Sequence, residues 1–164
     1  MRNVIILATD GVRYAVELRW VSEVISLGYV TPVPGSPPHV YGVVNVRGAI
    51  TPVLDLSPFS PAESKTLAAR RRPGSSPRSE GAVIIEVDGI TAALRMDTVD
   101  EVSSVVESDA RFSGPAIAAT VTDSQGRAVP LLDPTEVIRV VLASAHSSRL
   151  RVPMPPADGA THGQ

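Results

Sequence analysis

The sequence predicts a mainly β protein made of two copies of a five-stranded unit, followed by one helix. Three observations support this fold class. Apolar residues recur at every second position through most of the chain, as they do in half-buried strands. Asp-Gly, a pair typical of tight hairpin turns, occurs at 10–11 and again at 88–89. A unit of about fifty ordered residues leaves strand edges unpaired unless it closes, so each copy is expected to form a barrel.

The internal repeat keeps one register, an offset of 78 residues, from the start of the first copy to the end of the second. Composition bias would scatter Val and Ala matches but would not align turn and strand motifs together. The aligned motifs are Asp10-Gly11 with Asp88-Gly89, Glu23-Val24 with Glu101-Val102, Gly48 with Gly126, and Pro52–Asp55 with Pro130–Asp133.

The first copy contains five predicted strands. A hairpin joins the apolar run at 4–8 to the alternating run at 12–18, and a third strand follows at 21–27. Residues 31–38 contain four prolines, which exclude a helix or a central strand and indicate a rigid connector. The apolar, β-branched segment 41–56 then predicts a second hairpin that turns at Gly48.

The second copy and the C-terminus complete the predicted organisation. Asp133 is expected to cap a helix whose first turn contains Pro134 and the capping-box residue Glu136, with Val137, Ile138, Val141 and Leu142 on its apolar face. We expect a single domain over 1–145. Its parts are a first barrel over about 3–57, a mobile Arg/Pro/Ser-rich linker over 58–81, a second barrel over about 82–133 and a helix over 134–145. Within the linker, 63–71 is expected to form a short helix, and 146–164 a disordered tail.

Composition argues against several classes of function. The chain has no cysteine and a net charge of −2, which argue against disulfides, thiolate metal sites and a nucleic-acid-binding surface. No apolar run approaches the ~18–20 residues of a membrane helix. Its three histidines, at 39, 146 and 162, lie in the connector and the tail, where none can activate a nucleophile. We therefore expect a cytoplasmic protein that is not an enzyme, has no metal or cofactor and does not insert into a membrane.

Asn45 and Arg47 are the most unusual residues of the 41–56 hairpin, because they are expected at the buried end of a strand of valines. Arg47 could be structural, with its guanidinium bound to Asp55 or to a carbonyl, or it could contact a partner. The second copy replaces Asn45 and Arg47 by Asp123 and Gln125, which favours a partner-facing role for residues that the barrel does not need.

Other residues also have two possible interpretations. Trp20, Val21 and Val43 are either part of the core or contacts with a partner protein, and Glu23 is either exposed to solvent or such a contact. The Arg70–Arg72 cluster is either a solvated loop or a site for anionic lipid headgroups.

Taken in order, the motifs of the chain resemble those of the CheW family, the coupling proteins of bacterial chemotaxis-type signalling. The resemblance covers roughly 3–142 and is strongest over 12–56. The motifs that carry it are Tyr14-Ala15-Val16, Val21-x-Glu23-Val24-Ile25, Thr31-Pro32-Val33-Pro34, Gly42-Val43-Val44-Asn45-Val46-Arg47-Gly48 and Pro52-Val53-Leu54-Asp55-Leu56.

The resemblance implies two SH3-like barrels with a hydrophobic core between them. It also implies an adaptor that catalyses no reaction and that links the cytoplasmic tip of chemoreceptors to the regulatory domain of a CheA-type histidine kinase. Val21, Glu23 and Arg47 fall at positions associated with kinase or receptor contacts, and Gly42 and Gly48 shape the strand that displays them. The candidate protein-binding residues are Val21, Glu23, Val43, Asn45 and Arg47.

The predicted function is therefore a non-enzymatic adaptor at the inner face of the membrane, within receptor arrays where copies could also self-associate. One alternative is an accessory or inhibitory CheW-like module that binds only kinase or only receptor in a non-flagellar motility or developmental pathway. A rival from another class is a ligand-binding or hydrolytic β-barrel, which the absence of a His, Cys or metal constellation argues against.

Overall fold

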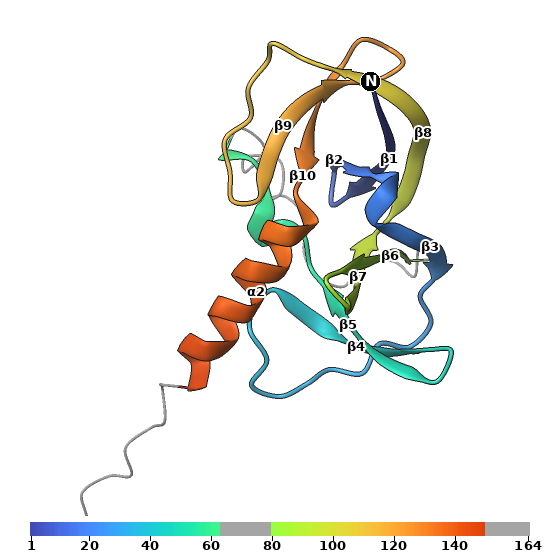
Figure 1. Ribbon diagram of the computed structural model, residues 1–164. Helices are drawn as coiled ribbons and strands as arrows, with labels where there is room; N and C mark the ends of the chain where they lie inside the picture. Colours follow the sequence, from blue (N-terminus) through green and yellow to red (C-terminus); the bar gives the residue numbers. More distant parts are fainter. Residues whose placement is uncertain (63–79, 150–164) are drawn as a thin grey trace, which may run out of the picture.

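The computed structural model describes residues 1–62 and 80–149 of the chain. The predictions for the 63–71 helix, the Arg70–Arg72 cluster, the rest of the linker up to 79 and the tail from 150 onwards lie outside these residues. Ten strands and one α-helix make the described part a mainly β structure, as predicted (Figure 1). The strands are β1 Arg2–Thr9, β2 Val12–Glu17, β3 Val21–Ser26, β4 Val40–Val46, β5 Ala49–Leu54, β6 Gly81–Val87, β7 Ile90–Met96, β8 Thr98–Glu107, β9 Ile117–Thr122 and β10 Ala128–Leu132; the helices are the 3₁₀ turns η1 Leu18–Trp20 and η2 Ser57–Phe59 and the α-helix α2 Pro134–Arg149.

The strands form two five-stranded layers, which lie one above the other in Figure 1. The upper layer is a closed barrel with the order β1-β2-β10-β9-β8. The lower layer, here called the open sheet, has the order β3-β6-β7-β5-β4, so β3 and β4 are its edges. The 78-residue offset places each strand of the first copy on its counterpart in the second, so the repeat read from the sequence holds throughout.

The two layers exchange hairpins, which corrects the predicted division into barrels over 3–57 and 82–133. The β1–β2 hairpin of the first copy pairs with β8 and β10, while the β6–β7 hairpin of the second copy pairs with β3 and β5. The prediction assumed that strands close in sequence pair with each other, which is the commoner arrangement. Because the two hairpins are repeats of one another, each fits the sheet of the other copy, and the exchange ties both copies into one structure.

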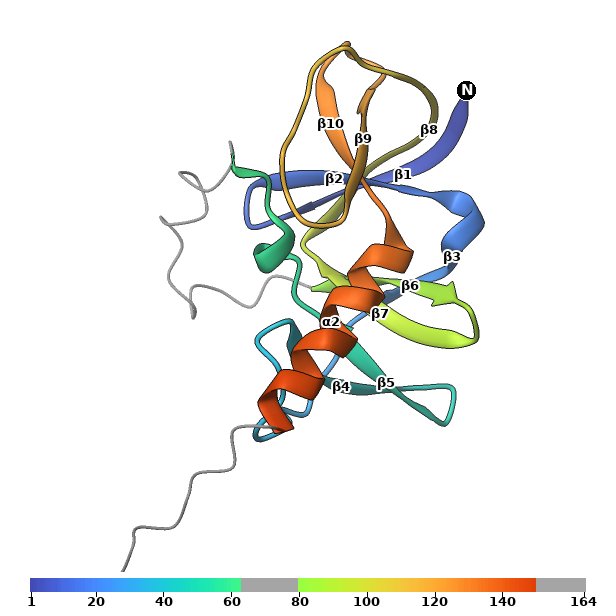
Figure 2. The ribbon, with the colours of Figure 1, turned by 60° about the vertical axis from the view of Figure 1, so that its left-hand side comes forward.

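The largest hydrophobic core lies between the two layers, as the resemblance implied. It joins Tyr14 of the closed barrel to Leu94 of the open sheet and to Val137 of α2, all fully buried. In Figure 2, α2 runs beside the junction of the layers. Each layer also has a smaller apolar interior, around Ile6 in the closed barrel and around Ile84 in the open sheet.

The chain just after β5 belongs to this core, although the sequence places the start of the linker at 58. Phe59 is fully buried, and the Tyr14 hydroxyl lies 3.0 Å from the Ser60 hydroxyl oxygen and donates to the Leu56 carbonyl at 3.3 Å. Burial raises the pKa of Tyr14 to about 12, so the phenol stays neutral and serves as a structural donor.

Helix α2 begins as predicted but ends later. The Asp133 carboxylate accepts the Thr135 N–H at 2.9 Å, which confirms Asp133 as the N-cap. The capping box is not completed, because the Asp133 N–H donates to the Ala116 carbonyl and Glu136 pairs with Arg139 instead. The helix extends to Arg149 rather than to 145, since no glycine or proline interrupts it before that point.

Gly42 lies within β4, where the connector passes against the strand, and not in a turn. A Cβ at this position would stand 2.5 Å from the Thr31 carbonyl oxygen and 2.7 Å from Val30 Cγ1. Thr31 and Val43 exchange both backbone hydrogen bonds, at 2.9 Å each, which fixes the connector at this distance. Gly42 therefore permits the close packing that holds the connector on the open sheet.

We expect Gly42→Ala to lower the free energy of unfolding by about 1–2 kcal/mol, because the added methyl meets a backbone carbonyl that cannot move without breaking the Thr31–Val43 pair. Urea denaturation followed by circular dichroism measures the change. Gly28→Ala is a matched control, since a Cβ at Gly28 meets nothing within 4 Å. Equal stability of the Gly42 variant and the wild type would refute this role.

Candidate functional site

The β4–β5 hairpin turns through Arg47 and Gly48, which both have positive φ, 50° and 84°. Positive φ at both central residues is the requirement of a type I′ turn, and Asn, Asp and Gly are the residues that adopt it most easily. Two other hairpins, β1–β2 and β6–β7, turn with positive φ at both residues of Asp10-Gly11 and Asp88-Gly89. Arg47 therefore occupies a position at which the backbone conformation of the turn favours Asn or Asp.

The Arg47 side chain is exposed, which corrects the prediction that it lies at the buried end of a strand. Its side chain is 80% accessible, and its Nη2 lies 2.6 Å from Oε2 of Glu23 on β3. The alternative partner considered from sequence, Asp55, instead accepts the N–H of Ser57. Because β3 and the hairpin after β4 belong to opposite edges of the open sheet, the Arg47–Glu23 ion pair spans the opening between those edges.

A groove of about 560 Å³ opens beside this ion pair, at one end of the interior of the open sheet. Residues of β3, of the β4–β5 hairpin and of the β6–β7 hairpin line it. They are Ser22, Glu23, Val46, Arg47, Ala49, Ile50, Thr51, Ile84, Glu86, Gly89 and Thr91. Of the five predicted protein-binding residues, Glu23 and Arg47 are brought together here and the other three are not.

Those other three residues have local roles in the structure. Val21 is partly buried against the core between the layers. Val43 is half-buried and pairs with Thr31, and since side chains alternate along a strand it lies on the face opposite to Val46. The Asn45 Oδ1 accepts the Gly48 N–H at 2.8 Å and so supports the turn. Trp20, also partly buried against the core, has the Arg19 guanidinium 5.0 Å from its ring centre.

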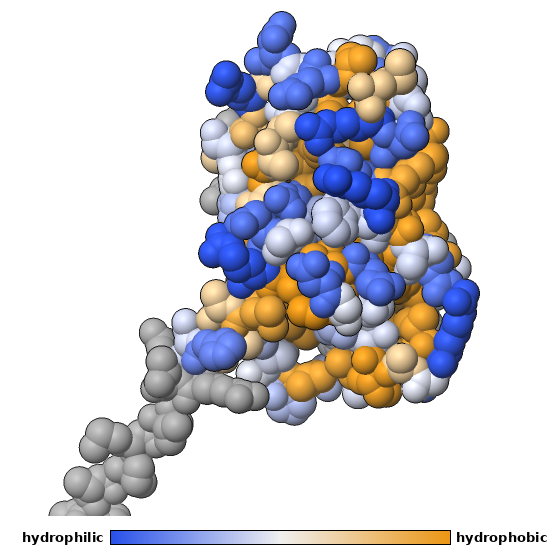
Figure 3. Space-filling model, viewed as in Figure 1, coloured by the Kyte–Doolittle hydropathy of each residue, from blue (hydrophilic) through white to orange (hydrophobic). Residues whose placement is uncertain are grey.

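Sequence reasoning missed the wall of the groove that the β6–β7 hairpin provides. Glu86 and Thr91 are paired neighbours in that hairpin, and both line the groove. The alternation of β6 does indicate that Glu86 shares a face with Ile84, but only the exchange of hairpins brings this face beside Glu23 and Arg47. Figure 3 shows hydrophobic residues gathered at the end of the molecule where β4 and β5 lie.

A second arginine lies at the other end of the same interior face. The Arg95 side chain is only 14% exposed, donates to Glu80 at 2.6 Å, and has its guanidinium 4.8 Å from the centre of the Tyr41 ring. The hydrogen bond to Glu80 raises the pKa of Arg95, so the group stays charged. Arg95 links the start of β6 to β4 and acts as a structural arginine, in contrast to the exposed Arg47.

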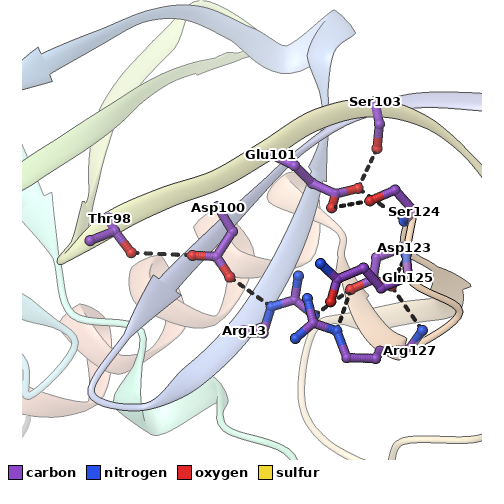
Figure 4. Close-up of polar contacts among 9 residues, drawn as sticks. All are labelled: Arg13, Thr98, Asp100, Glu101, Ser103, Asp123, Ser124, Gln125 and Arg127. Atoms are coloured by element: carbon purple, nitrogen blue, oxygen red, sulfur yellow. Dashed lines mark hydrogen bonds and ion pairs between the residues drawn. The ribbon is translucent and has the colours of Figure 1, made fainter.

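Asp123 is the centre of a polar cluster at the turn between β9 and β10 (Figure 4). Its buried carboxylate accepts the N–H groups of Gln125 and Arg127 at 2.9 and 2.8 Å, and the guanidiniums of Arg13 and Arg127 at 2.7 and 2.8 Å. Burial alone would raise the pKa of Asp123, but these donors outweigh it and hold the pKa well below its usual range.

The Asp123 cluster closes the barrel where backbone pairing is sparse. Strands β8 and β9 pair at two positions only, and β2 and β10 at one. Arg13 of β2 bridges Asp123 to Asp100 of β8, and Glu101 of β8 accepts the Ser124 hydroxyl at 2.8 Å. Asp123 is the repeat equivalent of Asn45, and both side chains accept N–H groups of the turn that follows them. Asn45 therefore supports the turn that follows it, as Asp123 does, so the difference between the copies at this position does not by itself indicate a partner contact.

The described residues, 1–62 and 80–149, contain no group of three or more His, Cys, Asp or Glu side chains placed to hold a metal ion. In the same residues, no helix has the length and apolarity needed to cross a membrane.

Two five-stranded sheets around a shared core, with a C-terminal helix, define the fold of a known scaffolding protein. The chain is similar to the crystal structure of the scaffolding protein TtCheW from Thermoanaerobacter tengcongensis, with a TM-score of 0.63 and 20% identity, over 81% of this chain and 84% of that one. It is 26% identical to the chemotaxis protein CheW of Rhizobium meliloti (strain 1021) over 151 residues, which are 92% of this chain and 90% of the relative.

A shorter stretch is more similar to another relative, the chemotaxis protein CheW of Bacillus subtilis (strain 168). It is 38% identical over 54 residues, which are 33% of this chain and 35% of the relative. The model of the CheW-like domain matches residues 3–141. The chain therefore belongs to the CheW family.

Proposed function

We propose that this chain is a non-enzymatic adaptor that couples chemoreceptors to a CheA-type histidine kinase, with the groove beside Glu23 and Arg47 as a docking site. Family membership supports the adaptor role, since the relatives are named as chemotaxis proteins and the similar solved structure as a scaffolding protein. On this proposal the protein works at the cytoplasmic tips of receptors, and Val21 is a neighbouring contact.

The observation that carries the proposal is the conformation of Arg47. An arginine at positive φ costs about 1 kcal/mol relative to glycine or asparagine, so a turn has no conformational reason to use one. The head of Arg47 is exposed and its one described ion pair is to Glu23. Strain held at an exposed, charged position beside a groove is typical of a binding site, and arginine is enriched at binding hot spots.

Co-purification tests the adaptor role directly. The chain would be tagged and mixed with two fragments from its source organism: the regulatory domain of the CheA-type kinase and the cytoplasmic tip of a chemoreceptor. We expect each fragment to bind alone, and a complex of all three to elute together in size-exclusion chromatography. Binding to one fragment only would favour the accessory module, and binding to neither would refute the proposal.

A further inference from the structure

The inner face of the open sheet changes from apolar to acidic where it reaches the groove. Along β6, Ala82, Ile84 and Glu86 point to this face, and the first two are part of the apolar interior. Ile84 is buried beneath the groove, and Val46 of the β4–β5 hairpin lines it. Glu86 follows as an exposed carboxylate at the mouth.

The charges in the groove do not cancel. Glu23 and Arg47 neutralise each other through their 2.6 Å contact. Glu86 makes no ion pair with any residue in the described part of the chain, which leaves the groove with one negative charge. Asp88, exposed in the turn of the same hairpin, adds a second carboxylate nearby. The groove therefore has an unpaired negative charge at its mouth and an apolar floor formed by Ile84 and Val46.

We propose that the groove receives a lysine or arginine side chain from the docked partner, with Glu86 as its counter-ion; this rests on the proposed function. Such a side chain has an apolar stem and a cationic head, and so matches an apolar floor that ends in a carboxylate. The stem packs on Val46 and Ile84, and the head pairs with Glu86. The cavity of about 560 Å³ is large enough for this side chain together with its neighbours.

A titration that needs no partner tests the chemistry of the groove. N-acetylarginine methylamide would be added at millimolar concentration to the ¹⁵N-labelled chain, with N-acetylglutamine methylamide as the uncharged control. We expect amide shifts at Glu86, Thr91 and Val46 with the arginine compound only, and their loss in Glu86→Gln. Shifts of equal size with both compounds, or none at these residues, would overturn the proposal.

A binding measurement then tests whether the partner uses the groove in this way. We expect Glu86→Lys to raise the Kd for one of the two fragments at least tenfold, and Glu86→Gln to raise it less and to weaken its dependence on salt. Glu107→Lys, the same change at an exposed glutamate of β8, should leave both Kd values within twofold. Unchanged binding by Glu86→Lys would overturn the inference and leave the adaptor role intact. Failure of the wild type to bind either fragment would refute the adaptor role, while the titration would still decide the chemistry of the groove.

Discussion

Replacing Asp123 by alanine is expected to lower the free energy of unfolding by about 3 kcal/mol. The buried carboxylate accepts four hydrogen bonds, and its removal leaves the two N–H groups of the turn without an acceptor and Arg13 with Asp100 as its remaining ion-pair partner. The loss falls where few backbone bonds close the barrel. Urea denaturation measures the change, and a loss below about 1 kcal/mol would show that the cluster is not needed for closure.

The milder variant Asp123→Asn tests the same cluster through the pH dependence of its stability, and the direction of the change can be predicted. The pKa of Asp123 is depressed in the folded protein, so the unfolded chain takes up the proton first, near its ordinary pKa of 3.8. The stability gained from the charged carboxylate is therefore complete above about pH 5 and is lost as the pH falls below about 4. The stability difference between wild type and Asp123→Asn should shrink over that lower range. Asp109→Asn, at an exposed aspartate, should show no such trend.

Arg47→Glu is expected to weaken binding to the kinase fragment or the receptor fragment by about 2 kcal/mol or more, roughly thirtyfold. The change removes the cation from the rim of the groove and places a second carboxylate against Glu23. Because the side chain is 80% exposed, the fold should remain intact, which circular dichroism would verify. Titration calorimetry with each fragment measures the binding.

Two further variants separate direct contact from the loss of an ion pair. Arg111→Glu makes the same charge reversal in the loop between β8 and β9 and should bind as the wild type does. The double variant Glu23→Arg with Arg47→Glu restores an ion pair with its charges exchanged. If Arg47 contacts the partner, the double variant stays weak. Full rescue would show that Arg47 acts only through Glu23, and unchanged binding by Arg47→Glu would refute the site.

Local patterns in the sequence predicted much of the fold. Alternation identified the strands, the Asp-Gly pairs marked two hairpin turns, and the 78-residue offset placed every strand of the second copy. These features depend on residues that are close together in the chain, so they can be predicted from the sequence alone. The N-cap Asp133 is predictable for the same reason, whereas the expected capping-box bond is lost to a competing tertiary bond from Ala116.

The exchange of hairpins is the feature that local patterns could not provide. The β1–β2 and β6–β7 hairpins have equivalent residues, so the sequence of neither hairpin indicates which copy it pairs with. That choice decides the groove, because it sets Glu86 and Thr91 of the second copy beside Glu23 and Arg47 of the first. The exposure of Arg47 was missed for a related reason. Its apolar neighbours suggest burial, but the two-residue turn carries it out of the sheet.

Kinase phosphorylation in a reconstituted system tests the coupling role most directly. The CheA-type kinase and receptor of the source organism would be assembled on membranes, and autophosphorylation measured with and without receptor ligand. Receptor ligand should change the phosphorylation rate only when the chain is present, and Arg47→Glu should abolish that control while the basal kinase activity persists. Control by the receptor in the absence of the chain, or full control with Arg47→Glu, would contradict the proposed coupling through this groove.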